Sequence, residues 1–237
     1  DGYARASGKV GVAMATSGPG ATNMVTGLAT AKLDSIPIIC ITGQVPRPAI
    51  GTDAFQEVDI YGTVFPVTKY SYLVLDINDL ASIIKEAFAV ARSGRPGPVL
   101  IDIPKDVQNE KIEFEYPRKP VKLPGNNIIK KPEKDKLLKA ATLINNSKKP
   151  VILAGHGILL SGASQEIIKL AEIASIPVTW TLLGSGGVPA SHPLNMGMMG
   201  MHGEYAVNNA IQEADLLIAC GMRFDDRVTG DVSTYSL

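Results

Sequence analysis

Short apolar runs alternate with amphipathic helical segments along most of the chain. Four runs in the first half are rich in apolar or β-branched residues: 10–15, 36–42, 67–75 and 99–103. Such runs are typical of strands buried in a parallel sheet. Between them, residues 21–33 are small and apolar enough for a buried helix, and apolar side chains recur at helical spacing from Leu80 to Ala91. The first half is therefore predicted to alternate strand and helix.

Turn-forming residues mark the ends of the predicted helices. We expect Asn78 or Asp79 to cap the helix that contains Leu80, and the stretch 93–96, which holds a glycine and a proline, to end it. Residues 1–7 are typical of the last turns of a helix that ends near Gly8. We therefore expect the chain to be a fragment of a longer protein.

A proline-rich segment separates the two halves of the chain. Residues 116–130 hold three prolines and a Gly-Asn-Asn sequence, a composition that excludes helix and indicates a linker. After it, strands are predicted over 150–154, 177–181 and 216–220, and helices around 137–144, 167–174 and 206–212. The predicted fold class is α/β, with two consecutive three-layer domains, 1–115 and 131–237, that have mainly parallel sheets and are both incomplete.

Charge and composition exclude some classes of partner. The chain has 237 residues, with 23 Lys and Arg against 23 Asp and Glu, so no basic excess is present to displace phosphate counterions. No apolar run approaches the roughly 20 residues that cross a bilayer. We therefore expect neither a nucleic-acid nor a membrane partner.

The two cysteines give little functional information. Cys40 and Cys220 lie in strand-like runs and fit no metal motif, which favours two reduced, buried thiols. A reducing compartment suits such thiols. The expected location is the cytoplasm, or a plastid or mitochondrion in a eukaryote.

The loops that follow the predicted strands are the candidate binding sites, because parallel sheets bind ligands beyond the carboxyl ends of their strands. Residues 17–23 follow a strand and open a helix, but they lack the Walker ending, and a tight turn without a ligand is the better interpretation of this motif alone. Residues 155–157, Gly-His-Gly, resemble a dinucleotide turn without its full spacing, so binding and structural interpretations are equally supported. Lys105 follows the strand at 99–103 and occupies a ligand-facing position.

Two arginines follow the last predicted strand. Arg223 and Arg227 suit the recognition of a carboxylate or phosphate, because a guanidinium donates two parallel hydrogen bonds. The alternative is a surface ion pair with Asp225 or Asp226. Nearby methionines favour either core packing or the wall of an apolar pocket: Met196, Met198, Met199 and Met201. The three histidines are far apart in the sequence, and we expect no metal site in this chain.

Taken as a set, these motifs resemble the large catalytic subunit of acetohydroxyacid synthase (acetolactate synthase), a thiamine-diphosphate enzyme. The resemblance runs nearly end to end. It is carried by residues 1–5, 16–23, 42–46, 51–57, 94–99, 104–107, 199–203 and 223–230. The early motifs are shared with related thiamine enzymes, whereas the last two are more specific to this synthase.

The resemblance implies functions for both domains. Residues 1–115 would be most of the pyrimidine-binding domain for thiamine diphosphate, and 131–237 the front of a central domain that holds FAD. Thiamine diphosphate would be contacted by Pro19, Asn23 and Gln44. The active site would be lined by Gln44, Phe55, Lys105, Met201 and Arg227, with Arg227 binding the carboxylate of a 2-ketoacid. FAD would be contacted by Arg95, His202, Gly203, Gly221, Met222 and Arg223.

The resemblance also implies which parts of the enzyme lie outside this chain. The family's cofactor-activating glutamate would precede Asp1, and the domain that holds Mg²⁺ and the diphosphate would follow residue 237. The complete enzyme would decarboxylate pyruvate and join it to a second 2-ketoacid, pyruvate or 2-ketobutyrate, in branched-chain amino-acid biosynthesis. A homodimer or tetramer and a small regulatory subunit are also implied. We expect the isolated chain to be inactive.

Two other interpretations stay open at this point. Another thiamine-diphosphate carboligase, oxidase or decarboxylase would share the early motifs. A non-catalytic nucleotide-binding module could use residues 131–237 alone. Binding of FAD, NAD and ADP distinguishes these, since a preference for NAD would favour the module.

Overall fold

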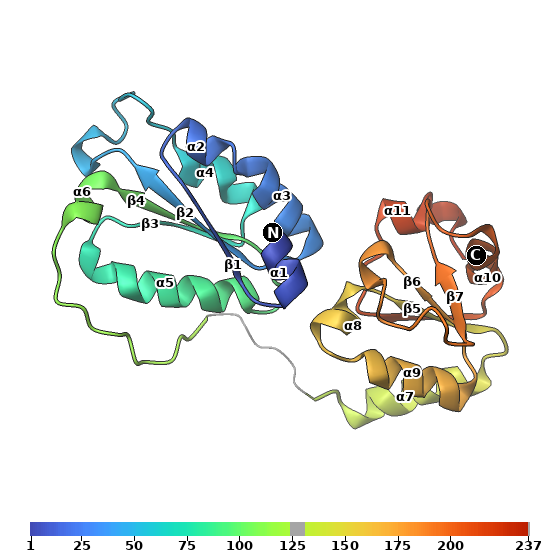
Figure 1. Ribbon diagram of the computed structural model, residues 1–237. Helices are drawn as coiled ribbons and strands as arrows, with labels where there is room; N and C mark the ends of the chain where they lie inside the picture. Colours follow the sequence, from blue (N-terminus) through green and yellow to red (C-terminus); the bar gives the residue numbers. More distant parts are fainter. Residues whose placement is uncertain (124–130, 237) are drawn as a thin grey trace. The chain divides into compact units, whose positions relative to one another are not determined.

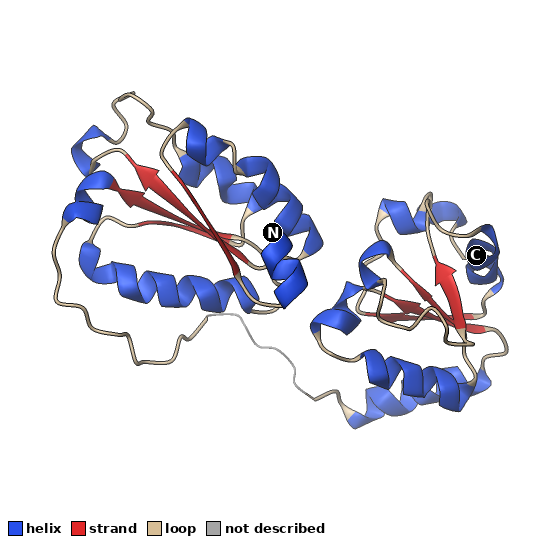
Figure 2. Ribbon diagram, viewed as in Figure 1, coloured by secondary structure: helices blue, strands red, loops and turns tan. Residues whose placement is uncertain are grey.

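The computed structural model describes residues 1–123 and 131–236. The chain divides into two compact units, Asp1–Ile128 and Ile129–Leu237, and each unit contains one four-stranded sheet. All strand pairs in both sheets are parallel (Figures 1 and 2). The predicted α/β fold class is therefore confirmed. Of the predicted linker 116–130, residues 116–123 contain neither helix nor strand, and the rest lies outside the described residues.

The first unit is built around a sheet with strand order β1-β2-β4-β3. Its strands are β1 (Gly11–Ala15), β2 (Ile38–Gln44), β3 (Tyr70–Leu73) and β4 (Val99–Pro104). Its helices are α1 (Gly2–Ser7), α2 (Pro19–Thr22), α3 (Val25–Asp34), α4 (Ile60–Val64), α5 (Ile77–Arg92) and α6 (Lys105–Asn109), with 3-10 turns η1 (Arg47–Ala49) and η2 (Phe65–Val67).

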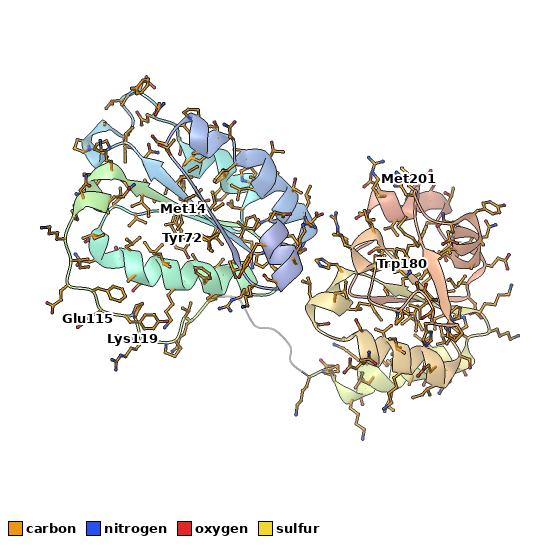
Figure 3. All side chains as sticks on the ribbon, in the orientation of Figure 1. Met14, Tyr72, Glu115, Lys119, Trp180 and Met201 are labelled. Carbon is orange, nitrogen blue, oxygen red and sulfur yellow. The ribbon has the colours of Figure 1, made fainter. Side chains whose placement is uncertain are left out.

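Both faces of this sheet are covered, as the continuous apolar runs of its central strands require. Ile39 and Ile101 pack with α5 on one face, where Tyr72 also lies between the sheet and that helix (Figure 3). Their sequence neighbours Cys40 and Leu100 point to the other face of the sheet and pack with α3 and α4. Alternate residues of β2 and β4 therefore belong to two different cores, and the unit has three layers (Figure 1).

The second unit repeats this architecture with strand order β7-β6-β5-β8. Its strands are β5 (Pro150–Ala154), β6 (Val178–Trp180), β7 (Asn195–Met198) and β8 (Leu216–Cys220). Its helices are α7 (Lys134–Asn146), α8 (His156–Leu160), α9 (Ser164–Ala174), α10 (Tyr205–Glu213) and α11 (Asp226–Thr229), with 3-10 turns η3 (Leu182–Gly184) and η4 (Val232–Thr234). Ile152 packs with α9 on one face, and Leu153 packs with α10 on the other.

Several predicted elements differ in detail from the structure. The helix predicted over 21–33 is two helices, because the chain turns at Asn23 and Met24 between α2 and α3, and Leu33 is exposed rather than buried. The strand predicted over 67–75 is only β3, since Phe65–Val67 forms a 3-10 turn around a proline. The cap of α5 is Asp76, whose side chain accepts a hydrogen bond from the backbone N–H of Asn78, so the predicted cap was wrong.

Candidate functional site

The carboxyl edge of the first sheet brings together three loops that follow neighbouring strands. Gln44, the last residue of β2, is paired in register with Pro104, the last residue of β4. Lys105 comes directly after Pro104 and begins α6 with an exposed side chain. Gln44 and Lys105 therefore lie at the same edge, where the parallel sheet predicts a ligand.

The loop after β1 contacts the loop that carries Phe55. Gly18 has a left-handed φ of 62°, and a Cβ atom at Gly18 would lie 2.6 Å from the carbonyl oxygen of Gln56. Glycine is needed here both for the conformation and for the close approach of the two backbones. Pro19 and Asn23, at the start and end of α2, are exposed beside this contact.

The loop 51–57 is closed by one carboxylate. Glu57 accepts hydrogen bonds from the backbone N–H groups of Gly51, Thr52 and Ala54, the last at 3.0 Å. These bonds, led by that of Gly51, hold the pKa of Glu57 below its usual range. The closed loop presents Phe55, whose side chain is 89% exposed, at the same edge of the sheet.

A buried polar cluster lies beneath this edge. Thr42 Oγ1 donates to Asp102 Oδ1 at 2.6 Å, and Gln44 Nε2 donates to Asp102 Oδ2 at 3.0 Å. Gln44 Nε2 also donates to the carbonyl of Val58 at 2.9 Å, while its Oε1 accepts from the backbone N–H of Val45. Asp102 is fully buried. Burial raises its pKa to about 6, against the lowering effect of the hydrogen bonds from Thr42 and Gln44.

An ion-pair network ties the loop after β2 to α6. Arg47 Nε lies 2.7 Å from Asp106 Oδ2, and its guanidinium also reaches Glu110 and the carbonyl of Leu75. The hydrogen bond with Arg47 is the main cause that lowers the pKa of Asp106. Because Asp106 is adjacent to Lys105, this network fixes the base of α6 relative to the loop that starts at Gln44.

In the second unit, glycines let the loops after β5 and β8 touch. Gly155 N donates to Cys220 O at 2.9 Å, and Gly157 N donates to Gly221 O at 2.7 Å. A Cβ atom at Gly157 would lie 2.6 Å from Gly221 Cα. Contact between backbones therefore accounts for the glycines of the Gly-His-Gly turn, which the sequence left open between binding and structure.

The loop after β7 is joined to α11. Met201 N donates to Arg227 O at 2.8 Å, and Arg227 Nη1 lies 3.3 Å from Met201 Sδ. Both side chains are exposed, and Figure 3 shows Met201 beside α11. Asn208 holds this loop by bonding both the N–H and the carbonyl of Gly200, each at 2.9 Å. The predicted pair of Met201 and Arg227 is thus brought together.

The surface ion pairs considered for the two arginines are also present. Arg223 lies 3.2 Å from Asp225, and Arg227 lies 3.7 Å from Asp226. These pairs are exposed and therefore weak, so they leave both guanidinium groups accessible to an anionic ligand. Gly221 and Met222 precede Arg223 in the same loop, while the exposed His202 and the half-buried Gly203 belong to the loop after β7.

Arg95 has a different setting from the other residues expected to contact FAD. It lies in the first unit, at the amino edge of the sheet, where it donates to Ser35 Oγ at 2.7 Å and to Leu33 O at 2.6 Å. It thereby binds the last turn of α3. A cavity of about 520 Å³ next to it is also lined by Lys32, Lys69, Tyr70 and Tyr72.

Comparison with protein families gives two matches, one in each unit. Residues 1–63 match the thiamine pyrophosphate enzyme N-terminal TPP binding domain, and residues 137–236 match the thiamine pyrophosphate enzyme central domain. Relatives with similar sequences match this chain over 99% to 100% of its length. The chain belongs to the thiamine pyrophosphate enzymes.

Within the thiamine pyrophosphate enzymes, the chain is similar to acetolactate synthases. It is 52% identical to the acetolactate synthase large subunit of Corynebacterium glutamicum over 235 residues, covering 99% of this chain and 37% of that protein. It is 51% identical to the probable acetolactate synthase large subunit of Methanocaldococcus jannaschii, covering 100% of this chain and 40% of that protein. For the acetolactate synthase of Arthrospira platensis the identity is 53%, over 100% of this chain and 42% of that protein. The chain thus spans about two fifths of the length of these relatives.

Residues 1–123 and 131–236 contain no group of three or more His, Cys, Asp or Glu side chains that could hold a metal ion. None of the helices in these ranges is both long and apolar enough to cross a membrane.

The sequence analysis missed four residues that organise the loops of the candidate site. Asp102 lies in an apolar run and reads as part of a strand, and its partners Thr42 and Gln44 are about sixty residues away. Arg47 and Asn208 bond across loops that only the fold brings together. Only Glu57 could have been found from its local sequence, because an acidic residue shortly after a glycine can close a loop by accepting from its backbone N–H groups.

Proposed function

We propose that the chain is the cofactor-binding part of an acetolactate synthase large subunit. The observation that carries this proposal is the identity of about one half with proteins of that name along the entire chain. The activity belongs to the complete protein, since the chain spans about two fifths of its relatives' length. In this proposal the complete protein condenses pyruvate with a second 2-ketoacid in branched-chain amino-acid biosynthesis.

The carboxyl edge of the first sheet fits the aminopyrimidine of thiamine diphosphate. Gly18 leaves room for two backbones to meet, and Pro19, Asn23 and Lys105 are exposed around that contact. One lone pair of Gln44 Oε1 is left after its bond with Val45 N, so Gln44 can accept from a ligand. When bound, thiamine diphosphate supplies the electron sink that makes the loss of CO₂ from a 2-ketoacid and the following carbon–carbon bond formation accessible.

The other exposed residues of this edge would shape the reaction site. Phe55 would provide an apolar wall that excludes water, because its ring stands out from a loop that Glu57 closes. Lys105 would bring a positive charge to the same edge, where it attracts anionic substrates. The ion pair of Arg47 with Asp106 would keep the backbone of the adjacent Lys105 in place.

The second unit would bind FAD and the carboxylate of a 2-ketoacid. The backbone contact of Gly157 with Gly221 fixes the loop that presents Met222 and Arg223 to FAD. The guanidinium of Arg227 would hold the ketoacid carboxylate, with Met201 covering the apolar part of the substrate. His202 and Gly203 would also contact FAD, and Mg²⁺ would be held by residues outside this chain.

The proposal extends to assembly and location. We infer a homodimer or tetramer with a small regulatory subunit, and a location in the cytoplasm or, in a eukaryote, a plastid or mitochondrion. Sedimentation of the purified complete protein would test the assembly, and imaging of a tagged protein would test the location.

Product analysis of the complete protein tests the activity directly. With thiamine diphosphate, Mg²⁺, FAD and pyruvate, we expect release of CO₂ and accumulation of 2-acetolactate. Replacement of Arg227 by Gln should impair the use of the second ketoacid, whereas Arg223→Gln should impair FAD binding. Formation of acetaldehyde or acetyl phosphate in place of 2-acetolactate would instead indicate a decarboxylase or an oxidase.

A further inference from the structure

We propose that Asp102 is a positioning residue that determines which end of the Gln44 amide faces the ligand at the carboxyl edge of the first sheet. This inference rests on the proposed function, in which Gln44 contacts the aminopyrimidine. Asp102 itself does not touch the ligand, because it is fully buried beneath Gln44.

The geometry places three polar side chains on one face of two paired strands. Thr42 and Asp102 are partners in the register of β2 and β4, and Gln44 lies two residues after Thr42 on the same face. Thr42 donates to one oxygen of Asp102 at 2.6 Å, and Gln44 Nε2 donates to the other at 3.0 Å. An ionised carboxyl group only accepts hydrogen bonds, so it attracts the amide nitrogen of Gln44 and repels the amide oxygen.

The polarity of Gln44 follows from these contacts. Both hydrogens of its Nε2 have partners, one in Asp102 and the other in the carbonyl of Val58 at 2.9 Å. Its Oε1 accepts one bond, from Val45 N at 2.8 Å, and has a second lone pair. Gln44 is thereby an acceptor toward a ligand, and the ligand must present an N–H or O–H donor. An aminopyrimidine has such a donor in its exocyclic amino group.

A purely structural role does not explain the choice of a carboxyl group at this position. Burial of a carboxylate is unfavourable unless its charge is compensated, and the charged group that acts on Asp102 is Asp59, the N-cap residue of α4, which has the same sign. Cys40, on β2, stays a neutral thiol, since burial raises its pKa to about 12. An apolar residue would fill the position at lower cost, but it would remove one of the three bonds that orient the Gln44 amide.

Hydrogen exchange of the Gln44 side-chain amide tests the positioning without any ligand. It is measured by NMR on the 237-residue chain, relative to the exposed Gln56 amide. Asp102→Leu should speed the exchange of Gln44 roughly tenfold, the factor that corresponds to one hydrogen bond to a charged group. Thr42→Val is the matched control, because it removes the other partner of Asp102 and should leave the exchange of Gln44 unchanged.

Asp102→Asn separates positioning from packing. Its Oδ1 can accept from Gln44 while its Nδ2 donates to the hydroxyl oxygen of Thr42, so the protection of Gln44 should be restored. Equal protection of Gln44 in the wild type and in Asp102→Leu would overturn the proposal.

A binding measurement on the complete protein tests the link to the ligand. The affinity for thiamine diphosphate should fall roughly tenfold in Asp102→Leu and be retained in Asp102→Asn. If exchange responds as expected but the affinities of all variants are equal, then Gln44 does not contact the cofactor, and its place in the proposed function is wrong. If the wild type does not bind thiamine diphosphate at all, the proposed function fails while the positioning of Gln44 by Asp102 stands.

Discussion

Asp102 couples the stability of the first unit to pH. Burial raises its pKa from 3.8 to about 6, so the folded chain binds more protons than the unfolded chain between these values. Folding stability therefore falls as the pH rises through this window, by about 3 kcal/mol at most. The stability that the neutral Asp102 carboxyl contributes is fully present below pH 3.8 and fully lost above about pH 6.

Replacement of Asp102 by Asn should abolish this pH dependence. The free energy of unfolding of the wild type, relative to Asp102→Asn, should drop by up to about 3 kcal/mol between pH 4 and pH 7. Urea titrations followed by NMR signals of Ile39 and Ile101 in the first core measure this difference. A difference that stays constant with pH would show that Asp102 keeps an ordinary pKa in the folded chain.

Among the secondary-structure elements, α5 offers a direct test of capping. Asp76→Ala should destabilise the first unit by about 1 kcal/mol, because the N–H of Asn78 loses its side-chain acceptor. Asp79→Ala, in the first turn of the same helix, should cost only about 0.3 to 0.5 kcal/mol through the helix dipole. Chemical denaturation of the two variants measures both values, and an equal loss would contradict Asp76 as the cap.

The loop after β7 depends on one side chain of α10. Asn208→Ala should destabilise the second unit by about 1 to 3 kcal/mol, because the buried backbone of Gly200 loses both of its bonds to this side chain. The only tryptophan, Trp180, lies in this unit, so its fluorescence follows the unfolding. The neighbouring Asn209 is exposed, and Asn209→Ala should change the stability by less than about 0.5 kcal/mol.

The accuracy of the predicted strands follows the continuity of their apolar runs. The central strands β2, β4 and β5 are continuous apolar runs and were predicted within two residues of their bounds. The edge strand β7 was missed, because Asn195–Met198 contains a glycine and no β-branched residue. Its backbone is paired with β6 through an irregular register, which depends on contacts that the sequence pattern does not express.

The same distinction holds for the candidate site. Lys105 was expected to face a ligand because it follows a predicted strand, whereas Gln44 was expected in the site only from the family resemblance; the structure places both residues at the same edge of the sheet. The polarity of Gln44 depends on Asp102, which is distant in sequence and lies in a different strand. Local patterns therefore located the loops, but the bonds that orient their side chains required the fold.

At the scale of the whole molecule, the residues that the family resemblance assigns to FAD are found in two separate units. Arg95 belongs to the first unit, whereas the other residues that the resemblance assigns to FAD belong to the second. Two of the guanidinium nitrogens of Arg95 already bond the end of α3. Arg95 can therefore act on FAD, on the stability of the first unit, or on both, and the two effects are measured separately.

Equilibrium dialysis of the 237-residue chain against FAD separates these roles. If Arg95 contacts FAD, then Arg95→Ala should weaken binding roughly tenfold, as expected for the loss of a hydrogen bond from a charged group. Arg92→Ala is the matched control, since Arg92 is an exposed arginine that bonds only the carbonyl of Phe88 in the described chain. A lower melting temperature of Arg95→Ala with unchanged FAD affinity would confine Arg95 to holding α3, and NAD binding in preference to FAD would contradict the flavin site as a whole.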